Sequence, residues 1–206
     1  MVFEDLSPLI PLDCFAFSLS LPRVERAVDA AALSQLTSLS GEESFAQVGA
    51  GYSSKGLYFH VEVKEPFQKA QFPRYEEGDA FELFIDTRDL KNSGFLTKFC
   101  HHFVFFPQEV DGIWGQEITH FRTEDRHELC APGALVVEAE LKKKSYALQI
   151  FIPSQCLHGY DQAIFKRVGL TYIVHRFGGE PQHFVLSSKY MAVAQHPSLW
   201  ASVQLN

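Results

Sequence analysis

Residues 57–64 read Leu-Tyr-Phe-His-Val-Glu-Val-Lys, and the spacing of their apolar side chains decides the fold. The odd-numbered residues of this stretch are all apolar, whereas the even-numbered ones are, apart from Tyr58, polar or charged. Successive side chains of a β-strand point to opposite faces of the sheet. The alternation therefore predicts a strand with one face in a core and the other toward solvent.

The same period of two recurs along most of the chain, and turns rich in Gly, Pro, Asn and Asp separate the segments. The clear segments are 81–86, 135–142, 146–152 and 168–174, and the weaker ones are 15–19, 45–52, 99–106, 183–186 and 199–205. About ten short strands separated by turns predict an all-β fold, an antiparallel β-sandwich of the jelly-roll or immunoglobulin-like type.

We expect a single domain over residues 1–206, because no linker, repeat or change of composition divides the chain. One or two short helices should accompany the strands. The apolar residues of Arg23–Leu36 could share one helix face, and Cys156–Ile164 could form a single turn. Segment 99–106 is apolar on both faces apart from His101 and His102, which predicts a strand inside a sheet and covered on both sides.

The composition is that of a globular protein with an aromatic interior, since 46% of the residues are hydrophobic and 19 are Phe. The net charge of −7 opposes a nucleic-acid or anionic-membrane surface, which would need clustered Lys and Arg. We therefore expect neither partner. The one basic run, Lys142–Lys144, lies between two expected strands and predicts a hairpin turn.

The predicted location is the cytoplasm. The first residues lack the pattern of a secretory signal, and no apolar run approaches the ~20 residues needed to span a bilayer. Four cysteines (Cys14, Cys100, Cys130 and Cys156) lie far apart and form no Cys-x-x-Cys pair. In a chain of this size that spacing indicates reduced, mostly buried thiols rather than a disulfide framework.

Several motifs in a fixed order resemble one known family. Residues 56–66 lead through a loop to 75–86, where an Asp-x-x-Glu motif at Asp79 and Glu82 opens a hydrophobic strand. Downstream follow a strand ending in Ile-Pro, a Gly-hydrophobic-x-hydrophobic strand and a closing strand, at 146–153, 168–174 and 196–205. This order is similar to that of the family 9 carbohydrate-binding modules and their DOMON-like relatives. The resemblance implies a jelly-roll-like sandwich that carries a ligand site rather than an active site.

Members of that family that bind sugar ends use two aromatic platforms, usually Trp. The first position falls near Tyr75, together with Phe72. The second falls around Ser187–Tyr190, where the sequence has no Trp. Trp200 is similar to the family's packing aromatic before the last strand and is not expected to contact a ligand.

Carboxylates are crowded along the Asp-x-x-Glu strand. Glu82 and Asp86 share one strand face, so they could bind sugar hydroxyls together with Arg176. Alternatively, Asp79, Asp86 and Asp89 could hold a structural calcium ion, the one cofactor that the sequence suggests. A third reading is that these acids pair with nearby Arg and Lys side chains and only stabilise the sheet.

Nine histidines raise the question of a metal ion. His101 and His102 are adjacent on a strand, so they must point to opposite faces and cannot bind one ion together. His60 and His175 lie on polar strand faces and could meet across a sheet as zinc ligands or as hydrogen-bonded side chains. The sequence contains no metalloprotease, nucleophile-elbow or phosphate-loop motif. It therefore predicts no enzyme.

The sequence leaves two functions open. The first is a non-catalytic module that binds a glycan through Tyr75, Phe72, Glu82, Asp86 and Arg176. The alternative is a cytoplasmic protein-interaction or self-associating sandwich, for example a homodimer, that uses an exposed aromatic face and has no sugar ligand.

Overall fold

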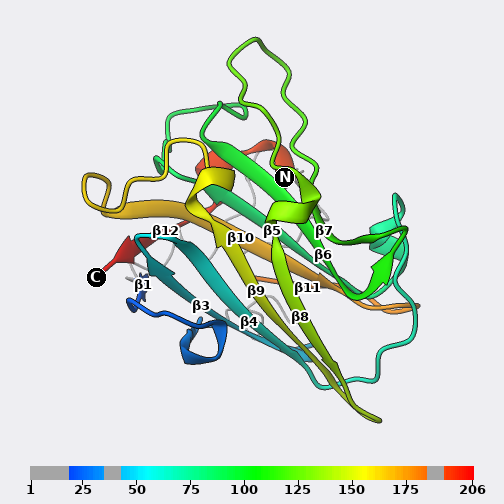
Figure 1. Ribbon diagram of the computed structural model, residues 1–206. Helices are drawn as coiled ribbons and strands as arrows, with labels where there is room; N and C mark the ends of the chain where they lie inside the picture. Colours follow the sequence, from blue (N-terminus) through cyan, green and yellow to red (C-terminus); the bar gives the residue numbers. More distant parts are fainter. Residues whose placement is uncertain (1–18, 35–42, 185–192) are drawn as a thin grey trace, which may run out of the picture.

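The computed structural model describes residues 19–34, 43–184 and 193–206, and it places their strands in two sheets that form a β-sandwich (Figure 1). Strands pair antiparallel throughout these residues except for β1 and β12, which run parallel. The predicted all-β sandwich is confirmed. Parts of the weak segments expected at 15–19 and 183–186 lie outside the described residues, as do Cys14 and the second platform position at Ser187–Tyr190.

Sheet A has seven strands, in the order β1-β12-β10-β5-β6-β7, with β11 paired to β10. Its strands are β1 (Leu19–Leu21), β5 (Ala80–Asp86), β6 (Cys100–Val110), β7 (Ile113–Glu117), β10 (Arg167–His175), β11 (Gln182–His183) and β12 (Ala201–Leu205). Strand β6 lies between β5 and β7, and most of its residues up to Pro107 are buried on both faces. The prediction for segment 99–106 is confirmed.

Sheet B has five strands, in the order β2-β3-β4-β9-β8. They are β2 (Ala31–Ala32), β3 (Ala46–Ser53), β4 (Gly56–Val63), β8 (Val136–Leu141) and β9 (Tyr146–Pro153). The turn between β8 and β9 contains Lys142–Lys144, as predicted. Short 3-10 helices connect the strands: η1 (Ala27–Asp29), η2 (Tyr75–Glu77), η3 (Pro132–Ala134), η4 (Ser154–Cys156), η5 (Val193–Gln195) and η6 (Pro197–Leu199).

The core lies between the two sheets and is built from the alternate residues that the sequence marks as apolar. Phe59 of β4 and Phe81 of β5 meet across the interior with ring centroids 6.3 Å apart. Phe81 in turn packs on Phe105 and on Tyr172, its neighbours in sheet A. All four side chains are buried, so the aromatic interior joins the sheets into one hydrophobic unit.

Part of the outer face of sheet A is also covered. Phe84 and Ile173 point outward from β5 and β10, and they pack under Leu96, Val193 and Trp200. The Trp200 side chain is buried and its indole Nε1 donates to the Val193 carbonyl at 2.9 Å, in the packing role that the sequence indicates. This cover leaves the neighbouring part of the same face open.

The helix expected at Arg23–Leu36 is wrong for its described residues. Only η1 is helical, and β2 follows it directly. The amides of Val24 and Leu33 donate to carbonyls of Tyr52 and Val48, so this segment pairs with the edge of β3. Edge pairing satisfies its backbone and overrides the helical spacing of its apolar residues. The turn expected at 156–164 is present, since the Phe165 amide donates to the Asp161 carbonyl.

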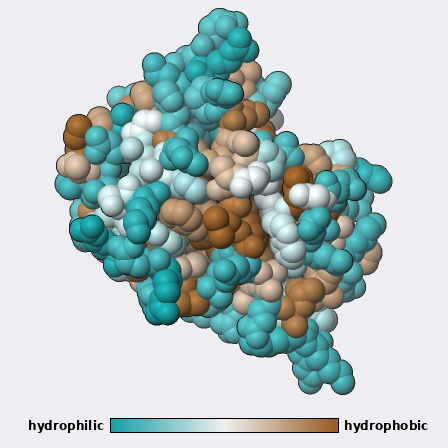
Figure 2. Space-filling model, viewed as in Figure 1, coloured by the Kyte–Doolittle hydropathy of each residue, from teal (hydrophilic) through white to brown (hydrophobic). Residues whose placement is uncertain are grey.

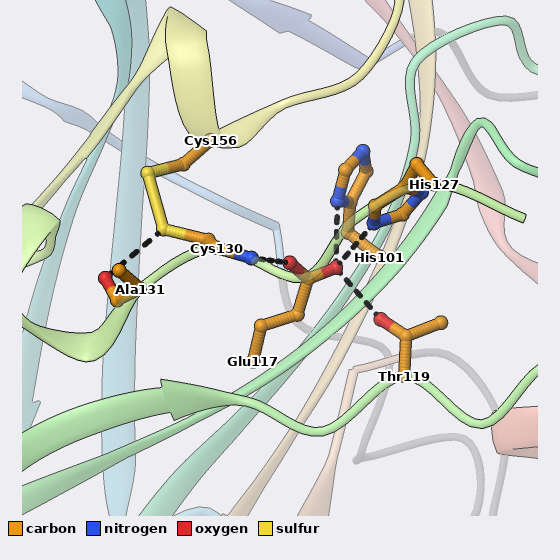
Figure 3. Close-up of a disulfide and its surroundings, with 7 residues drawn as sticks. All are labelled: His101, Glu117, Thr119, His127, Cys130, Ala131 and Cys156. Atoms are coloured by element: carbon orange, nitrogen blue, oxygen red, sulfur yellow. Dashed lines mark hydrogen bonds and ion pairs between the residues drawn. A yellow bond between two sulfur atoms is a disulfide. The ribbon is translucent and has the colours of Figure 1, made fainter.

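The prediction that the cysteines are reduced thiols is wrong for two of them. Cys130 and Cys156 form a disulfide, with Cα atoms 4.9 Å apart (Figure 3). The bond ties the connection between β7 and β8, residues 118–135, to η4. Cys100 is a free, buried thiol as expected, and burial raises its pKa to about 11. The cytoplasmic location stays a prediction, but reduced cysteines no longer support it.

Among the described residues, no helix has the length and apolar character required to span a bilayer.

Candidate functional site

A hollow of about 400 Å³ opens on the outer face of sheet A, beside the covered region. Strands β5, β6 and β10 form its floor, and η2 and η5 supply two of its walls. Its polar and aromatic lining consists of Tyr75, Glu76, Glu82, Phe84, His102, His120, His175 and Gln195. Pockets of this size, with few polar groups directed at one point, are typical of sites for small ligands.

Glu82 is the buried centre of the hollow. One of its carboxylate oxygens lies 2.7 Å from His102 Nε2, and the other lies 2.7 Å from His175 Nε2. The Tyr75 hydroxyl donates to the first oxygen at 3.1 Å. Strand register explains the cluster, because β5 lies between β6 and β10 and all three strands direct alternate side chains to this face.

The hydrogen bonds of this cluster keep the Glu82 side chain ionised. Burial alone would raise the pKa of Glu82, but hydrogen bonds from His102 and His175 outweigh it and lower the pKa to about 2. Burial and the nearby Glu82 charge raise the pKa of Tyr75. At neutral pH the hollow therefore holds a carboxylate and a neutral phenol.

Ring faces and edges surround this polar centre. The His102 imidazole stacks on Phe84 with centroids 4.2 Å apart. Tyr75 meets His175 edge to face at 5.8 Å and His102 in the same way at 6.5 Å. Packing and the hydrogen bonds to Glu82 hold the rings of Tyr75, His102 and His175 in place, so these rings form a preorganised surface.

The two predicted ligand aromatics of the loop 65–79 have different places in the structure. Tyr75 lines the hollow. Phe72 instead packs edge to face on Phe106 at 6.2 Å, in a small cluster with Ala80 and Val104. The loop is thus folded back over the outer face of sheet A, and Phe72 helps to anchor the segment that positions Tyr75.

Two other predicted ligand residues do not line the hollow. Asp86 lies at the opposite end of β5, where it accepts hydrogen bonds from the amides of Arg88 and Leu90 at 2.9 and 2.6 Å. Arg176 pairs with Glu65 and Glu43 and covers the Phe45 ring. Asp86 therefore orders a turn through backbone amides, and Arg176 pairs with acids outside the Asp-x-x-Glu strand, so neither forms the acid–base pair that the third reading predicts.

The predicted calcium ligands do not converge. Asp79 and Asp86 stand at the two ends of β5, roughly 20 Å apart by strand geometry. Asp79 accepts from the amides of Gln68, Lys69 and Phe177. Asp89 pairs with Lys91 at 2.8 Å and accepts from the Ser202 hydroxyl. Backbone and side-chain donors thus occupy these carboxylates.

The other face of β6 holds a second histidine–glutamate cluster. His101 Nδ1 and His127 Nε2 lie 2.9 and 2.8 Å from the same oxygen of Glu117, Oε1 (Figure 3). Burial would raise the pKa of Glu117, but hydrogen bonds from both histidines lower it to about 2. His101 and His102 thus point to opposite faces, as predicted. The idea that His60 and His175 meet is wrong, because they belong to sheets B and A.

Sheet B carries another hollow on its outer face, of about 420 Å³. Tyr58 stacks on Phe151 there, with centroids 4.6 Å apart, next to the exposed Val136. Figure 2 shows apolar side chains gathered over β8 and β9 and surrounded by hydrophilic residues. No buried carboxylate lines this hollow, since both of its acids, Glu25 and Glu138, are exposed.

Comparison with solved structures finds carbohydrate-binding modules. A family 9 carbohydrate-binding module from Caldicellulosiruptor kristjanssonii in complex with glucose has a TM-score of 0.65 and 12% identity, over 92% of this chain and 95% of that one. A family 9 module from the same organism in complex with cellotriose has a TM-score of 0.56 and 16% identity, over 78% of this chain and 74% of that one. No protein-family model and no curated protein matches the sequence. The chain therefore has a fold like that of the family 9 modules.

Proposed function

We propose that the chain is a non-catalytic module that binds a carbohydrate in the hollow around Tyr75, His102 and His175. The observation that carries the proposal is the position of Glu82, which holds three ring side chains at the floor of an open hollow. Sugars present flat C–H faces and many hydroxyl groups. Aromatic rings beside fixed polar groups match both features.

The fold supports this choice of ligand class, because the two solved family 9 modules contain glucose and cellotriose. The size of the hollow, about 400 Å³, suits one or two sugar units rather than a long chain. Glu76, His120 and Gln195 line its rim and would face the hydroxyl groups of such a ligand.

The same geometry opposes glycoside hydrolysis. A hydrolase needs a carboxylic acid that still holds a proton near neutral pH, opposite a second carboxylate. Glu82 has its pKa lowered to about 2, so it cannot supply that proton. The other acid in the hollow, Glu76, is exposed to solvent.

A glycan array followed by calorimetry on the hits tests the proposal. One aromatic platform contributes on the order of 1 kcal/mol beyond burial, so we expect weak binding, with a Kd of roughly a millimolar. Tyr75→Ala should weaken binding at least about fivefold, since it removes the platform and one donor to Glu82. Phe95→Ala is the matched control, because Phe95 is 47% exposed and does not line the hollow.

The alternative, a sandwich that binds protein or itself, predicts another outcome. In that case no glycan on the array binds, and light scattering shows a mass that rises with concentration. Equal binding by Tyr75→Ala and wild-type protein would also reject the proposed site.

A further inference from the structure

Three side chains of the kinds that bind transition metals, His101 of β6, Glu117 of β7 and His127, converge on the face of sheet A opposite the hollow. The nearest ligand atoms of His101, Glu117 and His127 all lie within 4.8 Å of one another. In the part of the chain that the structure describes, no other group of three His, Cys, Asp or Glu side chains meets in this way. The Glu82 cluster differs, because His102 and His175 each contact a separate oxygen.

The hydrogen bonds of His127 define which of its nitrogens carries a proton. Its Nδ1 lies 2.7 Å from the Lys98 carbonyl oxygen, which can only accept, so Nδ1 is protonated. In a neutral imidazole the lone pair then sits on Nε2, 2.8 Å from Glu117 Oε1. Two lone pairs that face each other at that distance require a positive centre between them, either a proton or a metal ion.

The surroundings favour a metal ion. A ligand histidine almost always donates its far N–H to a carbonyl or carboxylate, as His127 does to Lys98. The Cys130 amide donates to Glu117 Oε2 at 2.7 Å, which orients the carboxylate and leaves Oε1 directed at both histidines (Figure 3). The Thr119 hydroxyl lies 2.8 Å from Oε1 and could occupy or support a fourth position.

We propose that His101, Glu117 and His127 bind a divalent transition metal ion of the zinc type. Two imidazole nitrogens and one carboxylate oxygen suit zinc and not calcium, which prefers an all-oxygen shell. Metal–ligand distances of about 2.0–2.2 Å in a tetrahedral site require the present nitrogen–oxygen separations to widen by a few tenths of an ångström. Binding would displace the proton that lies between His127 Nε2 and Glu117, whereas His101 would bind through Nδ1 with its own proton on Nε2.

The position of the site indicates a structural role for the ion. His127 and Cys130 both belong to the connection 118–135, which contains only the short helix η3. The disulfide fastens this connection at Cys130. A metal ion at His127 would fasten it a second time, to β6 and β7. The His101 and Glu117 side chains are fully buried, so the ion would be enclosed rather than open to a substrate.

The test uses the untagged full chain after treatment with EDTA. Calorimetry with Zn²⁺ should show one ion per chain. Co²⁺ should give visible absorption bands of a four-coordinate nitrogen–oxygen site. An excess of Zn²⁺ about 100-fold over its Kd should raise the Tm by roughly 5–10 °C for a chain of this size.

His127→Gln and Glu117→Gln should each lose the Co²⁺ bands and the thermal shift. His60→Gln should keep both, because His60 lies on sheet B and belongs to neither cluster. The Co²⁺ spectrum of the wild-type protein decides the matter even if a variant fails to fold. Absence of stoichiometric Zn²⁺ or Co²⁺ binding by the wild-type chain, or unchanged binding by a folded His127→Gln, would overturn the proposal.

Discussion

Replacing Glu82 by Gln should destabilise the protein strongly, because the carboxylate is the common acceptor of His102, His175 and Tyr75. Its side chain is only 6% exposed, so solvent does not screen these contacts. The fall of its pKa from 4.5 to about 2 corresponds to roughly 3 kcal/mol of folding free energy at neutral pH. The amide of Gln keeps the shape but presents an N–H group toward one of the present donors.

We therefore expect Glu82→Gln to lose about 2–4 kcal/mol and roughly 5–15 °C in Tm for a chain of this length. Urea unfolding at pH 7 measures the loss directly. Glu62→Gln is the matched control: Glu62 is an exposed residue of β4, and its change should stay within about 0.5 kcal/mol.

The loss should also depend on pH. A carboxylate with a lowered pKa stabilises the fold above its unfolded value, 4.5, and this contribution disappears as the pH falls toward about 2. The difference between wild type and Glu82→Gln should consequently shrink between pH 5 and pH 2. A difference below about 0.5 kcal/mol at pH 7, or one that stays constant down to low pH, would refute the reasoning.

Three other changes probe the fold and the site. Gly56 has a φ of +150°, and a Cβ there would lie 2.0 Å from the Ile152 carbonyl oxygen, so Gly56→Ala should cost at least about 2 kcal/mol in urea unfolding; a near-neutral result would contradict the β4–β9 geometry. The double change Cys130→Ser and Cys156→Ser should cost about 3 kcal/mol, since the bond closes a loop with a sequence separation of 26. Peptide mapping without reductant should recover the linked pair, and two free thiols at these positions would count against the bond. Tyr75→Phe keeps the ring but loses the donor to Glu82, so it should cost about 1 kcal/mol in stability and retain more glycan affinity than Tyr75→Ala.

The period of two predicts most strands of both sheets, although β2 and β7 lie in none of the predicted segments. Alternation in 57–64 assigned Phe59 and Val61 to the core, and both are buried. The helical spacing of apolar residues in Arg23–Leu36 leads to a wrong prediction, because strand pairing overrides it and nothing in that segment shows that β3 offers a free edge. The disulfide was equally hidden, since its cysteines lie in a connection and in a 3-10 helix that have no periodic pattern.

The site was predictable only in part, because local sequence patterns identify some of its residues but not how distant strands align. Tyr75 and Glu82 were identified from the loop and the Asp-x-x-Glu motif, and the structure brings them together. Asp86 shares the strand face of Glu82 as predicted, but strand length carries it out of reach. His102 and His175 were missed as partners of Glu82, because their meeting depends on the register of β6 and β10 against β5. The alternation of side chains along a strand predicts which face of the sheet each histidine occupies. Only the register between strands decides which acid it lies beside.

The most direct test of the proposed glycan site is an NMR titration that follows the histidine side chains of the full protein while a sugar found on the array is added. The proposal predicts that the imidazole signals of His102 and His175 shift and saturate together, whereas those of His60 and His127 do not move. Shifts confined to other histidines, or a sugar that perturbs only the Tyr58 and Phe151 surface of sheet B, would contradict it.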